Sequence, residues 1–377
     1  MAPAAPSAPS RLQNVIAALR RFEHRSRCAY VRYVPPSILA RVDGPLRTLA
    51  GGVVRGVSAA FYLSQPLGVW SGLCAGRLAT VTMWGRPHDL QPLLDLLFDG
   101  EPSVQWHGRC SYAAALRQAA ALPAGAAEML VAATTPALAG AFRRRDCMIV
   151  PATLRLGGRP EAVSRFQRVA DKSLRSDLSL VRRSGYRLEV RPYRRLDSVR
   201  FYERYIVPHL RARFGDAAWV PTFEWIDRSF ASGLALLAWR PDADDPDAVL
   251  IVVPRGDVLW CAHLGTRDAD PAVLHGGGVA AVYAFAIRVA EGRGVQWLDM
   301  GRSRPWLTDG ITRYKWKWGF RPFVDPGEPL EWAIRVVRAD GSAASRFLES
   351  RPIVRSGARF SVISPHGVQP CDPVSAR

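Results

Sequence analysis

Residues Val295–Arg321 read VQWLDMGRSRPWLTDGITRYKWKWGFR, and the rest of the chain is interpreted outward from this stretch. Its first part, Val295 to Met300, favours a β-strand, contains the acidic Asp299 and stops at Gly301. After a cationic loop, a second run carries tyrosine, tryptophan and lysine over about two helical turns and ends at a capping glycine. A strand, a cationic loop and an aromatic helix can together hold an anionic or acyl-bearing substrate beside a sheet.

The residues before and after this stretch predict the rest of a mixed sheet. Turn sequences separate three apolar runs and favour an antiparallel meander over residues 234–239, 248–254 and 258–265. The sequence HGGG at 275–278 then leads into a helix at 279–291 and back to the strand at Val295. These elements form a βαβ unit, whose crossover should be right-handed. A last strand of the same sheet is expected at 330–337.

Two amphipathic helices are expected before the meander, at residues 161–184 and 197–214, with a half-buried strand between them from Tyr186 to Arg191. Beside its apolar face, the first helix carries a cationic stripe of Arg168, Lys172, Arg175 and Arg182. This stripe is either a solvated face or a surface for a phosphate group, anionic lipid or nucleic acid.

The composition is that of a globular protein with a large positive charge. The 377 residues are 48% hydrophobic and 22% charged, which excludes a fibrous or wholly disordered chain, and the length favours two domains. The formal net charge is +18, and residues 143–213 hold 19 Lys and Arg against 7 Asp and Glu. This excess either favours anionic partners, such as a phosphate-bearing cofactor or an anionic membrane surface, or reflects compositional bias.

Cysteine and histidine usage bears on metal sites and location. The six cysteines form no C-x-x-C pair and the seven histidines no H-x-x-x-H pattern, so neither a metal site nor a disulfide framework is expected. A reducing, cytoplasmic location fits this usage, with association at a membrane periphery as the alternative. The first ten residues, MAPAAPSAPS, lack the features of a secretory signal and are expected to be disordered.

The N-terminal half predicts alternating strands and helices, as in an α/β or α+β domain. After a helix at 11–24, strands are expected at 61–70, 78–84 and 129–133, and helices at 89–98, 112–122 and 135–145. A Gly157-Gly158 turn marks a boundary. The expected division is a disordered lead at 1–10, an N-terminal lobe at 11–157, a second domain at 158–340 and a C-terminal extension at 341–377.

The pattern D-x-G-R-S, followed after a short loop by D-G-x-x-x-Y-K-x-x-W-G-F, resembles the C-terminal signature of the FemAB-like branch of the GNAT acyltransferase superfamily. The match covers residues 159–331. It implies a GNAT-like mixed α/β sheet flanked by helices, with an N-terminal lobe that is either a degenerate second GNAT-type copy or an unrelated cap. It also implies a bacterial transferase that moves an acyl group from a thioester, acyl-CoA, to an amine or hydroxyl of a cell-envelope, glycan or lipid acceptor.

The resemblance assigns roles to individual residues. Lys315 would lie near the transferring carbonyl, where an ammonium stabilises an oxyanion or binds a phosphate, unless it is a surface lysine. Asp299 is either a general base or a buried carboxylate that holds the next loop. Tyr314 is either a core aromatic or the phenol that reprotonates a thiolate leaving group. The remaining candidates would contact an acceptor or a phosphate, and they are Arg302, Ser303, Arg304 and Arg175.

The resemblance also places the pyrophosphate of coenzyme A at a glycine loop before a helix, at His275, Gly276, Gly277 and Gly278. The pair Leu274-His275 departs from the arginine or glutamine that usually leads into this loop, and a flexible loop is the alternative. Two rival functions remain. One is an aminoacyl-tRNA-dependent transferase of FemAB type, although no coiled-coil arm is evident. The other is a non-catalytic module that binds an anionic ligand.

Overall fold

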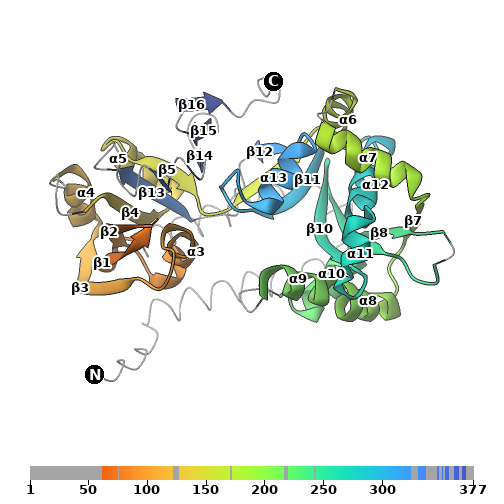
Figure 1. Ribbon diagram of the computed structural model, residues 1–377, viewed down its shortest axis with the longest axis horizontal. Helices are drawn as coiled ribbons and strands as arrows, with labels where there is room; N and C mark the ends of the chain where they lie inside the picture. Colours follow the sequence, from red (N-terminus) through yellow and green to blue (C-terminus); the bar gives the residue numbers. More distant parts are fainter. Residues whose placement is uncertain are drawn as a thin grey trace. The chain divides into compact units, whose positions relative to one another are not determined.

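The computed structural model describes residues 62–370 except for 75, 122–126, 170–171, 216–219, 242, 324–329, 337–345, 348–349, 351–352, 356–360 and 365–366. The chain divides into two compact units (Figure 1). The first lobe comprises the residues up to Thr153 together with Asp325–Pro370, and the second lobe is centred on Leu154–Val324. The expected lead at 1–10 and the expected helix at 11–24 lie outside the described residues.

The first lobe is built on a six-stranded sheet in the order β3-β1-β2-β4-β13-β5. Its strands are β1 (Ser64–Cys74), β2 (Arg77–Trp84), β3 (Ser103–Ser111), β4 (Met129–Thr134), β5 (Met148–Pro151) and β13 (Glu331–Val336). Its helices are α3 (Pro87–Leu97), α4 (Tyr112–Ala121) and α5 (Pro136–Arg143). The strands and helices predicted between residues 61 and 145 are confirmed. Strand β3 was not predicted because it lies at an edge with nearly every side chain exposed, so no apolar alternation marks it.

The second lobe is built on a seven-stranded sheet in the order β12-β6-β11-β10-β9-β8-β7. Strands β8 (Leu234–Trp239), β9 (Ala248–Arg255) and β10 (Val258–Thr266) form the predicted antiparallel meander. Strand β7 (Arg187–Arg191), predicted separately as a half-buried strand, pairs antiparallel with β8. The chain then passes through α11 (Pro271–His275) and α12 (Gly278–Gly292) to β11 (Trp297–Ser303), which pairs parallel with β10. Helix α13 (Gly310–Lys317) and strand β12 (Arg321–Phe323) follow.

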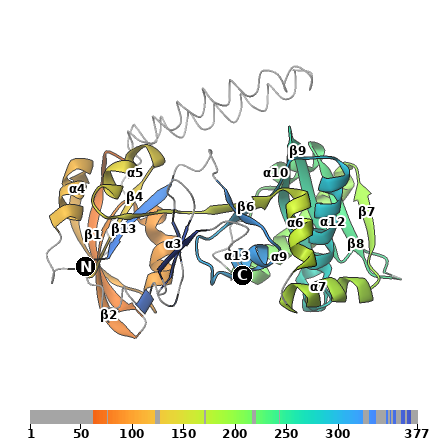
Figure 2. The ribbon, with the colours of Figure 1, turned by 90° about the horizontal axis from the view of Figure 1, so that it is seen from above.

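Helices cover the meander of the second lobe (Figure 2). Alternate side chains of β8 and β9, including Leu237 and Val249, form a buried cluster with Phe201, Tyr205 and Phe230 of α8 (Arg195–Phe201), the π-helical segment η1 (Tyr202–Ile206) and α10 (Phe223–Ala231). Because side chains alternate along a strand, the residues between them face the other side of the sheet. The apolar helix α12 packs on the sheet beside α6 (Pro160–Arg168) and α7 (Lys172–Arg183).

Two strands belong to sheets other than those expected. The last strand, β13, was predicted in the second domain but pairs antiparallel with β4 and β5 of the first lobe. Strand β6 (Leu154–Gly158) contains the expected boundary at Gly157-Gly158, and it pairs with β11 and β12 of the second lobe. The expected domains 11–157 and 158–340 are therefore wrong at both ends, because each lobe is completed by a strand that a sequential division assigns to the other.

The two predicted long helices are each interrupted. The structure has two helices, α6 and α7, where one helix was expected at 161–184. Helix α6 ends at Arg168, and the backbone dihedral angles of Val169 are not helical. The helix expected at 197–214 consists of α8, the π-helical segment η1 and α9 (Val207–Phe214) in succession. Short π-helical segments within α-helices are frequent at functional sites.

The two sheets have similar sequences of strand directions, with one more antiparallel strand in the second sheet. In each, antiparallel strands lead to one parallel pair, β2–β4 in the first lobe and β10–β11 in the second, and two more antiparallel strands complete the sheet. Two mixed sheets flanked by helices confirm the expected α/β fold class. In the second lobe, the order of meander, crossover helix and parallel strand is the order predicted from the turns and the apolar periodicity.

The expected C-terminal extension contains a small antiparallel sheet of β14 (Ile353–Arg355), β15 (Ser361–Ser364) and β16 (Gly367–Pro370). Within the described residues, the helices are all too short or too polar to cross a membrane.

Candidate functional site

The parallel pair β10–β11 opens beyond its first three paired positions. Pairing ends where Trp260 lies opposite Asp299, although β10 continues to Thr266 and β11 to Ser303. On its other side, β10 remains paired with β9 as far as Thr266. The described sheet is therefore open between β10 and β11, and the backbone of β10 presents an edge to the gap.

Irregular backbone on both strands shapes the opening. The register of β10 against β9 shifts between Cys261 and His263, and that of β11 against β6 shifts between Asp299 and Arg302. Within the second irregularity, Gly301 has a φ of 76°, and a Cβ there would lie 3.3 Å from the carbonyl oxygen of Cys261. Glycine satisfies both the positive φ and the close approach, and bulges of this kind commonly lie next to active sites.

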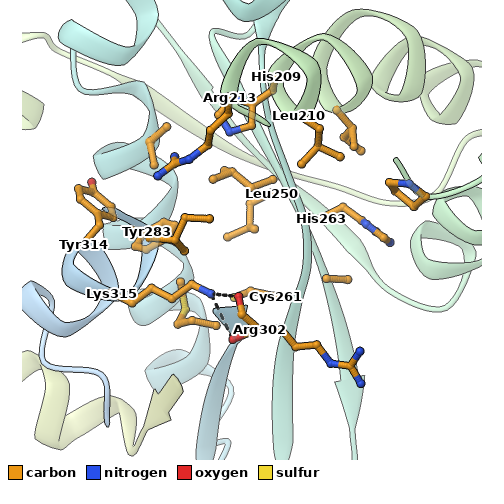
Figure 3. Close-up of a pocket in the computed structure, with 18 of the residues that line it drawn as sticks. His209, Leu210, Arg213, Leu250, Cys261, His263, Tyr283, Arg302, Tyr314 and Lys315 are labelled. Carbon is orange, nitrogen blue, oxygen red and sulfur yellow. Dashed lines mark hydrogen bonds between the residues drawn. The ribbon is translucent and has the colours of Figure 1, made fainter. Parts of the chain in front are cut away.

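A cavity of about 420 Å³ occupies the opening, and we call it the splay cavity (Figure 3). Its walls come from α9, β10, β11 and α13, together with Val279 and Tyr283 near the start of α12. Much of the lining is apolar and includes Ile206, Leu210, Phe214, Leu250, Leu264 and Ile311. This size and character are typical of small-molecule sites.

Lys315 lines the splay cavity and is only 4% exposed, so it is not the surface lysine of the alternative interpretation. Its Nζ donates hydrogen bonds to the carbonyl oxygens of Gly301 at 3.1 Å and Arg302 at 2.8 Å (Figure 3). It also donates one to Ser303 Oγ at 3.0 Å. Burial lowers the pKa of Lys315 to about 7, and the nearby carboxylate of Asp299 opposes this shift. Lys315 therefore fixes the irregular segment of β11 and brings a titratable amine to the cavity.

Asp299 is buried and does not line the splay cavity. One carboxylate oxygen accepts the backbone N–H of Gly301 at 2.8 Å, and the other is paired with Arg155 of β6. The guanidinium of Arg155 also lies over the ring of Trp260, 5.8 Å from its centroid. These contacts match the second of the two hypotheses for Asp299, a buried carboxylate that holds the loop after it.

Tyr314 lines the splay cavity from α13, one residue before Lys315. Its ring packs edge-on against Tyr283 of α12 with centroids 5.3 Å apart. Burial raises the pKa of Tyr314, and the carboxylate of Asp177 adds to the effect. The phenol is therefore protonated at neutral pH, as a proton donor to a leaving group must be, and both hypotheses for Tyr314 stay open.

The four predicted substrate contacts do not gather at one place. Arg302 lines the splay cavity, but Figure 3 shows its side chain extending away from Lys315. Ser303 is buried and engaged with Lys315, while Arg304 is exposed and its carbonyl accepts a hydrogen bond from Thr312. Arg175 is exposed on α7. Ser303, Arg304 and Arg175 are absent from the lining of the cavity.

The glycine loop at 275–278 does not line the splay cavity. The amides of Gly276 and Gly277 donate within the chain, to the carbonyls of Ala272 and Leu274. A Cβ atom added at Gly276 would lie 2.8 Å from the carbonyl oxygen of Ala272. One added at Gly277 would lie 3.2 Å from the side chain of Leu180, and one added at Gly278 would lie 2.8 Å from the side chain of Val273. Packing between α11, α12 and α7 is thus a sufficient reason for the three glycines, and His275 is the last residue of α11. A pyrophosphate cradle here stays a prediction.

Sequence reasoning missed three neutral groups in the cavity wall. His209 Nδ1 lies 2.9 Å from Thr266 Oγ1, and His263 Nε2 lies 3.1 Å from Ser229 Oγ. Burial lowers the pKa of each imidazole to about 4, and Arg213 adds to the shift at His209. Burial raises the pKa of the Cys261 thiol. Each group lies alone in an apolar run, so no local pattern distinguishes it from a core residue.

Sequence reasoning also missed Arg213, which lines the splay cavity from the last turn of α9. A signal was present, because Ile206, Leu210 and Arg213 recur at helical spacing and Arg213 interrupts an apolar stripe. Figure 3 shows its guanidinium on the same side of the cavity as Tyr314.

The first lobe has a parallel pair without a comparable opening. Strands β2 and β4 pair at four positions, and the last of these involves Trp84, the final residue of β2. The Trp84 ring is buried against Tyr112 and Phe142. Strand β2 therefore ends where pairing ends, whereas β10 continues past it and leaves a gap.

Metal-binding side chains do not cluster in the part of the chain that the structure describes, where no group of three or more His, Cys, Asp or Glu could hold an ion.

Comparison with known proteins gives structural likeness at low sequence identity. No protein-family model and no curated protein sequence matches the chain. Among solved structures, L-PGS from Bacillus licheniformis matches at 11% identity and a TM-score of 0.36, covering 77% of this chain and 91% of that chain. FemX matches at 9% identity and a TM-score of 0.36, covering 74% and 90%. A GCN5-related N-acetyltransferase from Sphaerobacter thermophilus matches at 14% identity and a TM-score of 0.31, covering 56% and 60%.

Proposed function

We propose that the protein is an acyltransferase of GNAT type that moves an acyl group from a thioester, acyl-CoA, to an amine or hydroxyl. The observation that carries the proposal is the buried amine of Lys315 in the wall of a largely apolar cavity, at the point where β10 and β11 separate. An opening between two strands offers both a backbone edge and a largely apolar space, in which a hydrogen-bond donor stabilises a developing charge more strongly than in water.

The geometry suggests how a donor would bind. An extended arm that carries amide groups can pair with the exposed edge of β10 as an added strand does. Helix α12 reaches the cavity at Val279, within its first turn, so its N-terminus would favour the phosphates of such a donor. Both contacts use the backbone, and they therefore need no sequence motif.

The reaction begins when the acceptor nitrogen or oxygen attacks the thioester carbonyl and forms a tetrahedral oxyanion. The ammonium form of Lys315 would stabilise this oxyanion if one of its N–H groups turned from a backbone carbonyl of β11 to the substrate. Collapse of the intermediate breaks the carbon–sulfur bond, and the protonated phenol of Tyr314 could donate its proton to the thiolate. The proton that the acceptor nitrogen or oxygen loses then restores the phenol, so the reaction releases the acylated acceptor and the free thiol. Asp299 receives no role in proton transfer because both of its oxygens are engaged away from the cavity.

The cavity lining disfavours an aminoacyl donor. The α-ammonium of an aminoacyl group needs a carboxylate or several acceptors, but the described lining contains no Asp or Glu and three cationic side chains, Arg213, Arg302 and Lys315. An uncharged acyl group meets no such cost, so we prefer acyl-CoA to aminoacyl-tRNA. The acceptor belongs to the cell-envelope, glycan or lipid classes named above.

A paired substitution on α13 tests the role of Lys315. The purified chain would be incubated with acetyl-, octanoyl- or palmitoyl-CoA and a panel of amines and hydroxyl compounds, and released CoA measured by chromatography. We expect Lys315→Met to reduce kcat/KM at least about tenfold, because one preorganised oxyanion donor is lost. The matched control Lys317→Met removes the same charge from the same helix, where Lys317 pairs with Asp177 at 2.6 Å, and should stay within about twofold of wild type.

The result also separates the proposal from its rivals. Equal losses in the two variants would remove Lys315 from the mechanism. Thermal stabilisation by tRNA with no response to any acyl-CoA would favour the aminoacyl-tRNA reaction. Binding of anionic ligands without acyl transfer in any combination would favour the non-catalytic module.

A further inference from the structure

The charged side chains in the described lining of the splay cavity are all basic. Its charged lining residues are Arg213, Arg302 and Lys315, and no Asp or Glu belongs to the described lining. The two histidines in the wall are neutral at physiological pH because burial lowers the pKa of each to about 4. A ligand that fills the cavity therefore experiences a net positive potential, which favours an anion.

Arg213 is the most available of these cations. It is exposed, and among the residues that the structure describes it has no ion pair and no hydrogen-bond partner, only the ring of Phe214 with its centroid 5.9 Å away. Other arginines nearby are occupied, since Arg200 and Arg204 both pair with Asp245. One guanidinium nitrogen of Arg213 lies 3.8 Å from the Cβ position of Gly310, where α13 begins. A guanidinium in this state can bind a carboxylate or phosphate through two parallel hydrogen bonds.

The wall beside Arg213 is apolar. Leu210 lies one helical turn before Arg213 on α9, and the cavity wall continues to Ile206 and to Leu250 of β9. Leu250 is 2% exposed and Ile206 1%, so both belong to the lobe's core and present a fixed hydrocarbon surface. Polar atoms of a ligand would lose water against this wall without gaining a partner, whereas a hydrocarbon chain gains on burial.

We propose that the splay cavity binds an acidic amphiphile, with a hydrocarbon chain against Leu210 and Leu250 and a carboxylate or phosphate at Arg213, and that Arg213 determines specificity for the acid. The role of this amphiphile as a substrate rests on the acyl transfer proposed above. Its binding does not, because both contacts exist without turnover. A ligand with a cationic head group would meet Arg213 and Lys315 with no carboxylate in the described lining, so the site rejects it.

Four eight-carbon probes separate the contributions of charge and chain. The probes share the same eight-carbon hydrocarbon chain and differ in their head group, and they are octanoate, octyl phosphate, octylammonium and octan-1-ol. Their binding to the full-length protein is measured by calorimetry. We expect the anion that fits to bind at least about tenfold more tightly than octan-1-ol, because a hydrogen bond to a charged partner contributes about 1.5–3 kcal/mol. Octylammonium should not bind. Whichever of octanoate and octyl phosphate binds more tightly identifies the acidic group.

Two neighbouring arginines on α9 provide the matched control. Arg211 and Arg213 are both exposed, but only Arg213 lines the cavity. Arg213→Gln should weaken binding of the anionic probe at least about tenfold and leave octan-1-ol unchanged, while Arg211→Gln, which removes the same charge, should stay within about twofold of wild type. Equal losses in the two variants would mean that only the overall charge matters, and the proposal would fail.

A substitution in the wall of the splay cavity tests where the hydrocarbon chain of the ligand binds. Leu210→Trp fills part of the cavity, so octanoate or octyl phosphate should lose affinity while the corresponding four-carbon anion keeps it. The circular dichroism spectrum confirms that the variant is folded. Equal losses for both chain lengths, or a wild-type protein that binds neither eight-carbon anion, would overturn the proposal. Binding of the anions without acyl transfer would leave this inference standing and count against the proposed reaction instead.

Discussion

The buried amine of Lys315 should tie the free energy of unfolding to pH. Burial lowers its pKa from 10.5 to about 7 in the folded chain, while the unfolded chain restores the higher value. Between these values the unfolded chain binds a proton that the folded chain does not, so the free energy of unfolding rises with pH. The destabilisation is complete below pH 7 and disappears above pH 10.5, and over the full window it amounts to about 5 kcal/mol.

The accessible part of this window can be measured by urea denaturation. From about pH 7 to about pH 8.5, Lys315 alone should raise the free energy of unfolding by about 1.6 kcal/mol. Thiols and phenols also titrate at alkaline pH, and burial raises the pKa of groups such as Cys261 and Tyr283. These groups are identical in wild type and Lys315→Met, so the difference between the two proteins isolates the lysine.

The prediction would be refuted if the difference in the free energy of unfolding between wild type and Lys315→Met did not change with pH. If the stabilities of wild type and Lys315→Met ran parallel within about 0.5 kcal/mol across this range, Lys315 would hold the same proton in both folded and unfolded chains. Its three hydrogen bonds would then compensate the burial of the charge fully, and the amine would not titrate near neutral pH.

Two further substitutions test the backbone that shapes the cavity. Asp299→Asn removes the charge opposite Arg155 and should lower the free energy of unfolding, measured by urea denaturation, by about 3 kcal/mol. The control Asp257→Asn, at an exposed residue, should change the free energy of unfolding by less than about 0.5 kcal/mol. A small effect at Asp299 would mean that the pair is not buried. Gly301→Ala should cost about 1–2 kcal/mol because of its positive φ and the carbonyl of Cys261 at 3.3 Å, measured as a lower melting temperature. Gly292, with open space around its Cβ position, is the control, and equal effects at the two glycines would contradict the strained geometry.

Much of the architecture follows from local patterns. The limits of β8, β9 and β10 agree with the apolar runs within a residue or so, and α12 agrees with its predicted helix. These elements are short, strongly apolar and bounded by turn residues, so local preference and burial favour the same structure. Lys315 and Tyr314 could also be singled out, because they lie in the D-G-x-x-x-Y-K-x-x-W-G-F pattern that carries the resemblance. Asp299 could be singled out too, but its two possible roles could not be separated.

Tertiary contacts determine the rest, because they join residues that are distant in sequence. Asp299 binds Arg155, 144 residues away, and this contact engages one of its two carboxylate oxygens. The sequences of strands β6 and β13 both predict short strands and do not indicate to which sheet either belongs. Hydrogen bonding with β11 assigns β6 to the second lobe, and hydrogen bonding with β4 assigns β13 to the first. The point where β10 and β11 separate, the burial of Lys315 and the open position of Arg213 are likewise properties of packed neighbours. Local sequence sets which segments are strands and helices, but a side chain's charge state and accessibility depend on what surrounds it, and that is determined only when the chain is folded.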